Sequence, residues 1–144
     1  MGTSIRPEIS ESNEYHISKH RYYELKHFCL QYGEWKKLSE KARQTVGSTE
    51  VTRHAEGTHS NPTHALAVDR MLYRSRIDLV ETAASLADPD IAPYILEAVT
   101  EGLSYPQLKA RLDVPCGKDM FYDRYRRFFS ILDLLKTRSE RRAV

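Results

Sequence analysis

The stretch from residue 102 to residue 135 constrains the fold more than any other part of the chain, because it carries the signals of two helices joined by a turn. Ser104 and Gln107 have the S-x-x-Q spacing of a capping box, in which both side chains satisfy backbone amides at a helix start. Pro106 falls in the first turn of that helix, where its missing N–H costs nothing. The helix is expected to end near Asp113, because Val114 precedes a proline and Gly117 follows closely.

A second, longer helix is predicted over residues 117–136, because large apolar residues recur there at helical spacing. These residues are Phe121, Tyr125, Phe128, Leu132 and Leu135. Such a stripe packs on a core and leaves the opposite, basic side of the helix outside. A short capped helix followed by a longer one is the plan of a helix-turn-helix, whose second helix enters the DNA major groove. The alternative is a pair of helices packed for stability alone.

The N-terminal half of the chain divides into three parts. Residues 1–13 are polar and aperiodic, which predicts a disordered arm. Residues 14–44 carry an apolar stripe that predicts one long amphipathic helix, with Gly33 as a candidate bend. Residues 45–61 contain glycines and many hydroxyl side chains without an apolar period, and we interpret them as a linker or loop.

Residues 62–144 are predicted to form a C-terminal helical domain that contains the helix-turn-helix at 104–136. Its four helices are expected at 62–87, 90–101, 104–112 and 117–136. Asn61-Pro62 and Asp90 provide helix starts, and Gly102 provides a helix end. One side of the first of these helices should be buried through Val68, Leu72, Leu79, Val80, Ala83 and Leu86. No segment alternates like a strand, so the expected fold is all-α, a long N-terminal helix plus a four-helix unit.

The net charge of +2 hides an asymmetry along the chain. Residues 118–144 hold eight Lys or Arg against four acidic residues, so this segment is +4 and the first 117 residues sum to −2. Positive charge gathered on the last helix suits a surface that contacts phosphates, because neutralising phosphates supplies most of the non-specific affinity for DNA. For the final residues, an ordinary solvated chain end explains the charge equally well.

Other function classes find little support in the sequence. No run approaches the roughly 18 apolar residues of a membrane helix, and the N-terminus lacks the apolar centre of a signal peptide, so a cytoplasmic protein without membrane contact is expected. No metalloprotease, hydrolase or nucleotide-binding motif occurs, and we expect neither an enzyme nor a cofactor. The six histidines complete no metal-ligand pattern, and Cys29 and Cys116 are expected to be free thiols.

One run of the chain carries a resemblance to a known family. The run is V-P-C-G-x-D-x-F-Y-D-R, from Val114 to Arg124, and the similarity extends over about residues 22–136. In these residues the chain resembles the ArpU/RinA-type regulators of phages and prophages. The resemblance implies a bacterial host, a transcriptional regulator of late phage genes, and a C-terminal domain similar to the sigma-factor region that reads promoter DNA. It also implies double-stranded DNA as a partner, with RNA polymerase as a further candidate.

If the last helix reads DNA, base contacts should come from its first turns and phosphate contacts from flanking residues. The candidate DNA-contacting residues are Lys109, Arg111, Lys118, Tyr122, Arg126 and Arg127. Lys and Arg can donate to guanine, and Tyr can stack or bond to the backbone. Asp123 could accept from cytosine, but an ion pair with Arg127 one turn later is the favoured reading. The turn at 113–117 is longer than usual, so the last helix either begins inside it, at Cys116, or crosses at a different angle.

Two rival functions remain open at this stage. The first is a small terminase-like subunit for DNA packaging, which would also bind DNA but would assemble into a ring. The second is a protein that binds RNA polymerase, which would show no salt-dependent affinity for DNA. The mass in solution separates a monomer or dimer from such a ring. Homodimerisation, its interface, the operator and the direction of regulation are not determined by the sequence.

Overall fold

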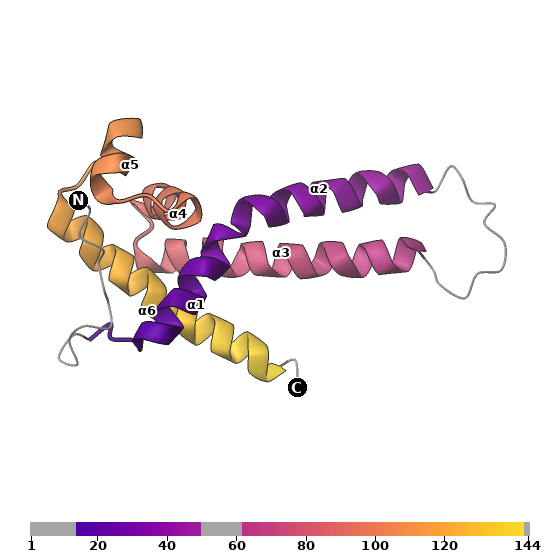
Figure 1. Cartoon of the computed structure of the whole chain (residues 1–144), viewed down its shortest axis with the longest axis horizontal. Helices are drawn as coiled ribbons and strands as arrows, with labels where there is room; N and C mark the ends of the chain where they lie inside the picture. The colour runs from indigo at the N-terminus through magenta and orange to yellow at the C-terminus, as the bar shows by residue number, and fades with distance from the viewer. Residues whose placement is uncertain (1–13, 50–61, 143–144) are drawn as a thin grey trace. The chain divides into compact units, whose positions relative to one another are not determined.

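The computed structural model describes residues 14–49 and 62–142, and within these ranges every regular element is an α-helix (Figure 1). The helices are α1 (Lys19–Leu30), α2 (Tyr32–Thr49), α3 (Pro62–Ala87), α4 (Ala92–Glu101), α5 (Tyr105–Arg111) and α6 (Lys118–Arg142). The predicted all-α fold is confirmed for this part of the chain. The predicted arm, and residues 50–61 of the predicted linker, lie outside the described residues.

The helix ends of the C-terminal half follow from the local chemistry of the sequence. The Ser104 hydroxyl accepts from the Gln107 N–H, and the Gln107 side chain accepts from the Ser104 N–H at 2.9 Å, which completes the predicted capping box of α5. Gly102 ends α4 in the left-handed region, at φ 68°. A Cβ at this position would also lie 3.2 Å from Cδ2 of Leu30. Both the backbone conformation and the available space therefore favour glycine.

The predicted N-terminal helix is divided in two. Ser18 accepts a hydrogen bond from the Arg21 N–H, so α1 begins at Lys19 rather than at residue 14. At Gln31 the backbone N–H bonds to the carbonyls of Phe28 and Cys29, and the side-chain amide donates to the His27 carbonyl. These bonds tighten the last turn of α1 and satisfy its free carbonyls, so the interruption falls at Gln31 rather than at Gly33.

Three other boundaries differ from the predictions. Residues 45–49 are helical and belong to α2, so that helix extends into the predicted loop. The N-cap position of α4 is Ile91, not Asp90, because the Asp88 carboxylate accepts from the Asp90 N–H at 3.0 Å and holds this turn before the helix. The last helix begins at Lys118, after the whole turn, and continues to Arg142, six residues beyond the predicted end.

The chain forms two compact units, and the first comprises residues up to 31 together with residues 79–144. In it α6 packs against α1, α4 and α5. The core of this unit is aromatic on α6 and aliphatic on the helices around it. Its largest fully buried side chains are Phe121, Phe128, Phe129, Leu25, Ile95, Leu108, Leu132 and Val80. Three residues of the predicted stripe of α6, Phe121, Phe128 and Leu132, are therefore on its buried face, with Phe129 as an addition, whereas Tyr125 and Leu135 are half-buried.

The second unit, residues 32–78, consists of α2 and the first part of α3, which lie side by side and antiparallel in Figure 1. Tyr32, Trp35 and Ala42 are buried on α2, and Ile77 is buried on α3. The guanidinium carbon of Arg76 lies 5.9 Å from the centroid of the Trp35 ring. This contact and the aromatic side chains of α2 hold the pair together.

The prediction of the buried side of α3 was only partly right. Val80 and Ala83 are buried as expected, and they are joined by Ile77, Ala84 and Ala87. Of the other residues of the predicted stripe, Leu79 is half-buried, and Val68, Leu72 and Leu86 are exposed. The helix has apolar residues on two sides, so periodicity alone could not tell which side faces the protein.

Candidate nucleic-acid interface

The α5–turn–α6 segment is held together by two tyrosines that hydrogen-bond to the backbone. The Tyr105 hydroxyl donates to the Cys116 carbonyl at 2.7 Å, which ties the start of α5 to the end of the turn. The Tyr105 N–H, at the first residue of α5, donates in return to the Tyr122 hydroxyl at 3.1 Å. An N–H at this position has no partner within its own helix, so Tyr122 of α6 supplies one. These two bonds fix the position of α5 on α6.

The inner side of α6 is a continuous row of aromatic contacts. Phe129 meets Tyr22 of α1 edge to face, with ring centroids 5.1 Å apart, and also lies against Tyr125 at 4.9 Å. The hydroxyl oxygens of Tyr22 and Tyr125 are 3.1 Å apart, within hydrogen-bonding distance. Burial, followed by the interaction with Tyr22, raises the pKa of Tyr125, so this hydroxyl stays protonated. The row therefore orients α6 through both packing and a polar contact.

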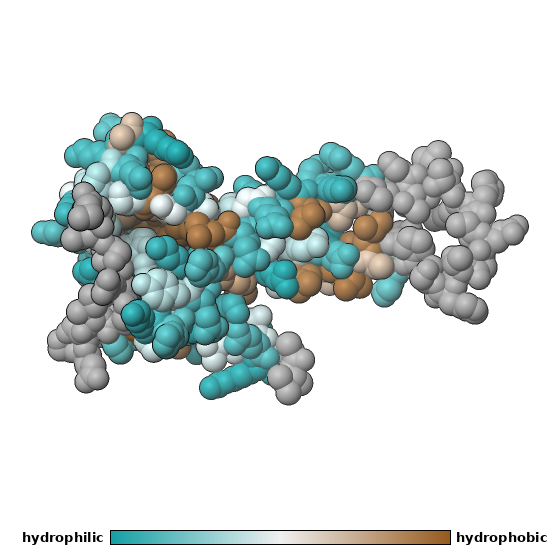
Figure 2. All heavy atoms as spheres, viewed as in Figure 1, coloured by the Kyte–Doolittle hydropathy of each residue, from teal (hydrophilic) through white to brown (hydrophobic). Residues whose placement is uncertain are grey.

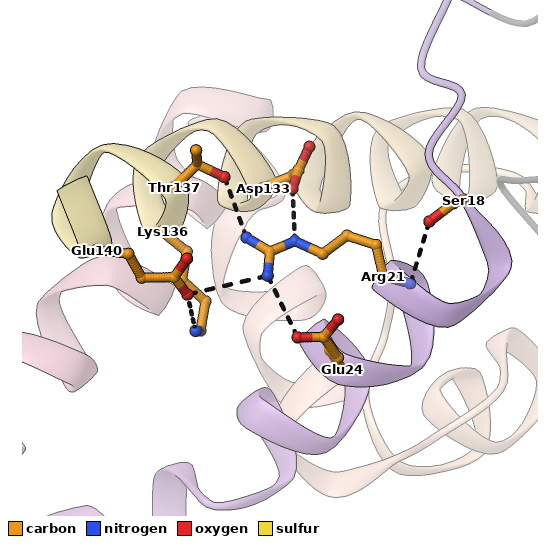
Figure 3. A network of polar contacts seen from close by, with 7 residues as sticks. All are labelled: Ser18, Arg21, Glu24, Asp133, Lys136, Thr137 and Glu140. Atoms are coloured by element: carbon orange, nitrogen blue, oxygen red, sulfur yellow. Dashed lines mark hydrogen bonds and ion pairs between the residues drawn. The ribbon is translucent and has the colours of Figure 1, made fainter.

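A charged network joins the C-terminal half of α6 to α1 (Figure 3). The Arg21 guanidinium donates from Nε to Asp133 at 2.6 Å and from Nη2 to Thr137 at 3.1 Å. Its Nη1 lies within ion-pair distance of Glu24 and Glu140. Burial by itself would lower the pKa of Arg21, but the hydrogen bond to Asp133 and the negative charges of Asp133, Glu140 and Glu24 together outweigh it, and the pKa is raised. Sequence reasoning missed this network, since Arg21 and Asp133 are 112 residues apart.

A second charged contact ties α6 to the turn before α4. Arg124 donates from Nε to Asp88 at 3.0 Å and also pairs with Asp123. The sequence favoured an ion pair between Asp123 and Arg127. In the structure Asp123 pairs with Arg124 instead, and the same guanidinium also bonds to Asp88. Burial alone would raise the pKa of Asp88, yet the hydrogen bonds from Arg124 and from the Asp90 N–H lower it.

Three of the six candidate DNA-contacting residues are exposed, and they flank the turn. Lys109 and Arg111 lie at the end of α5, and Lys118 is the first residue of α6. The Lys109 ammonium lies 5.8 Å from the centroid of the Tyr105 ring. The three cations thus come from the two helices that Tyr105 and Tyr122 connect. Backbone phosphates could approach them without a change in the fold.

The other three candidates, Tyr122, Arg126 and Arg127, are half-buried. The Tyr122 hydroxyl already accepts the bond from Tyr105, so it can offer a ligand only its remaining hydrogen-bonding capacity. The Nε of Arg126 is buried and has no hydrogen-bond partner within the described residues. The outer side of α6 is thus less open at Tyr122 and Arg126 than at Lys118.

The described residues form neither a metal-binding site nor a reactive-thiol site. No group of three or more His, Cys, Asp and Glu side chains there is arranged to hold a metal ion. Cys29 and Cys116 are free, and burial raises the pKa of both thiols, which makes them poor nucleophiles. None of the described helices is long and apolar enough to cross a membrane.

The geometry is thus that of a short and a long helix locked at one end, with cations on both sides of the turn. Comparisons of the whole chain with protein-family models, with curated proteins and with solved structures gave no match.

Proposed function

We propose that this protein is a sequence-specific DNA-binding regulator of transcription and that α5 and α6 form its helix-turn-helix. The observation that carries the proposal is the exposure of Lys109, Arg111 and Lys118 around a turn whose inner side is pinned by Tyr105 and Tyr122. A rigid pair of helices with exposed cations at their junction can place one helix end in a groove and bond to phosphates beside it.

The resemblance of the sequence to ArpU/RinA-type regulators supports phage or prophage genes as the target. The excess of positive charge over residues 118–144 supports DNA as the ligand. Lys118, at the start of α6, is the residue best placed for a base edge, since recognition helices read bases with their first turns. Lys109 and Arg111 would then act on phosphates from the preceding helix.

The experiment is a selection of bound fragments from bacterial or phage DNA with the full chain, followed by titration of the enriched site. We expect a short common motif near promoters. Lys118→Ala should weaken binding to that motif by about 1–3 kcal/mol. Lys37→Ala is the matched control, because Lys37 is also an exposed lysine on a helix but belongs to the other unit.

The outcomes separate the proposal from its rivals. If no motif is enriched and DNA affinity does not depend on salt, the protein is not a DNA-binding regulator. If Lys118→Ala and Lys37→Ala weaken binding equally, α6 is not the reading helix. A ring of eight or more subunits in solution would favour a packaging protein instead.

A further inference from the structure

The first part of α3 carries large apolar side chains on its outer side. Val68, Met71 and Leu72 are 49%, 72% and 47% exposed, although they lie within five consecutive residues. Hydrophobic surface is visible over α2 and α3 in Figure 2. Single exposed apolar residues are ordinary, but a contiguous group on one helix indicates a contact surface.

The spacing of this group is that of a helix-pairing seam. Ala65, Val68, Leu72 and Ser75 are separated by three, four and three residues, all four are exposed, and we call them the outer seam. Alternating steps of three and four are the a and d positions of a heptad, which meet the same positions of a second helix. Met71 widens the seam along one edge.

The inner side of the same helix is already used within the unit. Leu66, Tyr73 and Ile77 are half-buried or buried, and they lie roughly opposite the outer seam at 100° per residue. The helix is therefore apolar on two sides, as expected for one that packs on its own chain and on a second helix.

The charged residues beside the outer seam are complementary to those of a second, antiparallel copy of α3. Asp69 and Arg76 both follow a seam residue directly, which places them on one edge, seven residues and about two turns apart. Asp69 is exposed and has no ion pair within the described residues. When two such helices run antiparallel, this edge meets the same edge of the other helix. Asp69 then faces Arg76 of the partner subunit, and the reciprocal pair forms by symmetry.

We propose that the outer seam of α3 is a homodimer interface, in which a second copy of this chain packs antiparallel about a two-fold axis at the height of residue 73. Because this axis lies near the C-terminal end of the seam, Val68 of each copy meets the partner's Leu79, which continues the a and d positions beyond Ser75 and is half-buried. In this register Leu72 of each copy lies beside Ser75 of the other, so a large side chain fills the space left by a small one. The two reciprocal Asp69–Arg76 pairs fix the register. A parallel pair would bring Arg76 opposite Met71 of the partner subunit and would lose this complementarity.

The interface is short, because in this register the two helices overlap only over about residues 65–81, roughly 25 Å of helix. We therefore expect a reversible dimer with a dissociation constant on the order of micromolar, as is usual for interfaces below the standard size. The inference does not depend on DNA binding, because the seam lies on α3 and not on α5 or α6.

The first test is sedimentation velocity of the full chain over a concentration series, without DNA. The wild type should shift from monomer to dimer as its concentration rises. Leu72→Glu should lower the association constant at least about 10-fold, because a charge would be buried in the seam. Ala67→Glu is the matched control, since Ala67 is also exposed on α3 but lies away from the seam. Circular dichroism confirms that both variants remain helical.

The second test exchanges charges. Asp69→Arg alone places like charges together in its homodimer, and so does Arg76→Asp alone, so both should associate at least about 10-fold more weakly. An equimolar mixture of the two variants restores opposite charges at both pairs and should dimerise like the wild type. This recovery also shows that the Arg76 variant is folded, although it loses the contact with Trp35.

Three outcomes would overturn the inference. These are a wild type that stays monomeric into the hundred-micromolar range, a Leu72→Glu variant that dimerises like Ala67→Glu, and a mixture of charge variants that associates no better than either alone.

Discussion

The contact between Arg21 and Asp133 offers a quantitative test of how α6 is held in place. Arg21 is 19% exposed and Asp133 30%, so their bond at 2.6 Å is partly shielded from water. Hydrogen bonds to charged groups contribute about 1.5–3 kcal/mol, whereas exposed ion pairs contribute about 0–1 kcal/mol. The ion pairs of Arg21 with Glu24 and Glu140 are of the exposed kind, because these two carboxylates are 64% and 52% exposed.

The unfolding free energy of the Arg21→Ala variant should therefore fall by about 2–3 kcal/mol, including the lost packing of the side-chain stem. In a double-mutant cycle with Asp133→Ala, the coupling energy should be about 1–2 kcal/mol, since each carboxylate or guanidinium left alone still reaches water. Urea unfolding followed by circular dichroism gives all four stabilities. Lys19→Ala, an exposed change on α1, is the control and should stay within about 0.5 kcal/mol of the wild type.

A coupling energy below about 0.3 kcal/mol, within the error of additivity, would refute the reasoning. It would mean that the Arg21–Asp133 pair contributes little to holding α1 against α6. A coupling that vanishes in high salt would show that the pair behaves as an exposed one.

Three further predictions concern the segments that position α5 and α6. Gly102→Ala should destabilise the fold by about 1–2 kcal/mol in urea unfolding, because φ is 68° there; an unchanged midpoint would contradict this. Tyr105→Phe should cost about 1 kcal/mol through the lost bond to the Cys116 carbonyl, and a cost near zero would show that water replaces it. The Asp88 pKa is lowered in the folded state, so its pairing with Arg124 stabilises at neutral pH. The advantage of the wild type over Asp88→Asn should shrink as the pH falls below the ordinary value of 3.8, and a pH-independent difference would contradict it.

Features of the fold that depend on short-range chemistry could be predicted from the sequence. Ser104 and Gln107 define the start of α5, and Gly102 the end of α4, because capping involves residues within one turn. The buried face of α6 followed from its spacing. Phe129 lies outside the predicted stripe. It is nevertheless buried, because α1 also packs against α6 and Tyr22 of α1 contacts the Phe129 ring.

Features that depend on distant residues could not be predicted in this way. The exposed side of α3 depends on which of its two apolar sides α2 covers, and the Arg21–Asp133 bond joins residues 112 apart. The interruption at Gln31 is local, but the bonds that its N–H and side chain make to the preceding turn leave no distinctive pattern in the sequence. At the candidate interface, the residue types indicated which side chains could contact DNA. Only the structure separated exposed Lys118 from Tyr122, whose hydroxyl is already bonded to α5.

The central claim is that exposed cations around the α5–α6 turn contact DNA phosphates, and the salt dependence of affinity tests it most directly. Binding to a labelled duplex is measured over a series of salt concentrations, with the wild type and with the combined Lys109→Ala and Arg111→Ala variant. If both cations neutralise phosphates, the slope of log K against log salt should become shallower by about 1.8, at about 0.9 per phosphate. An identical slope for the two proteins would contradict the claim.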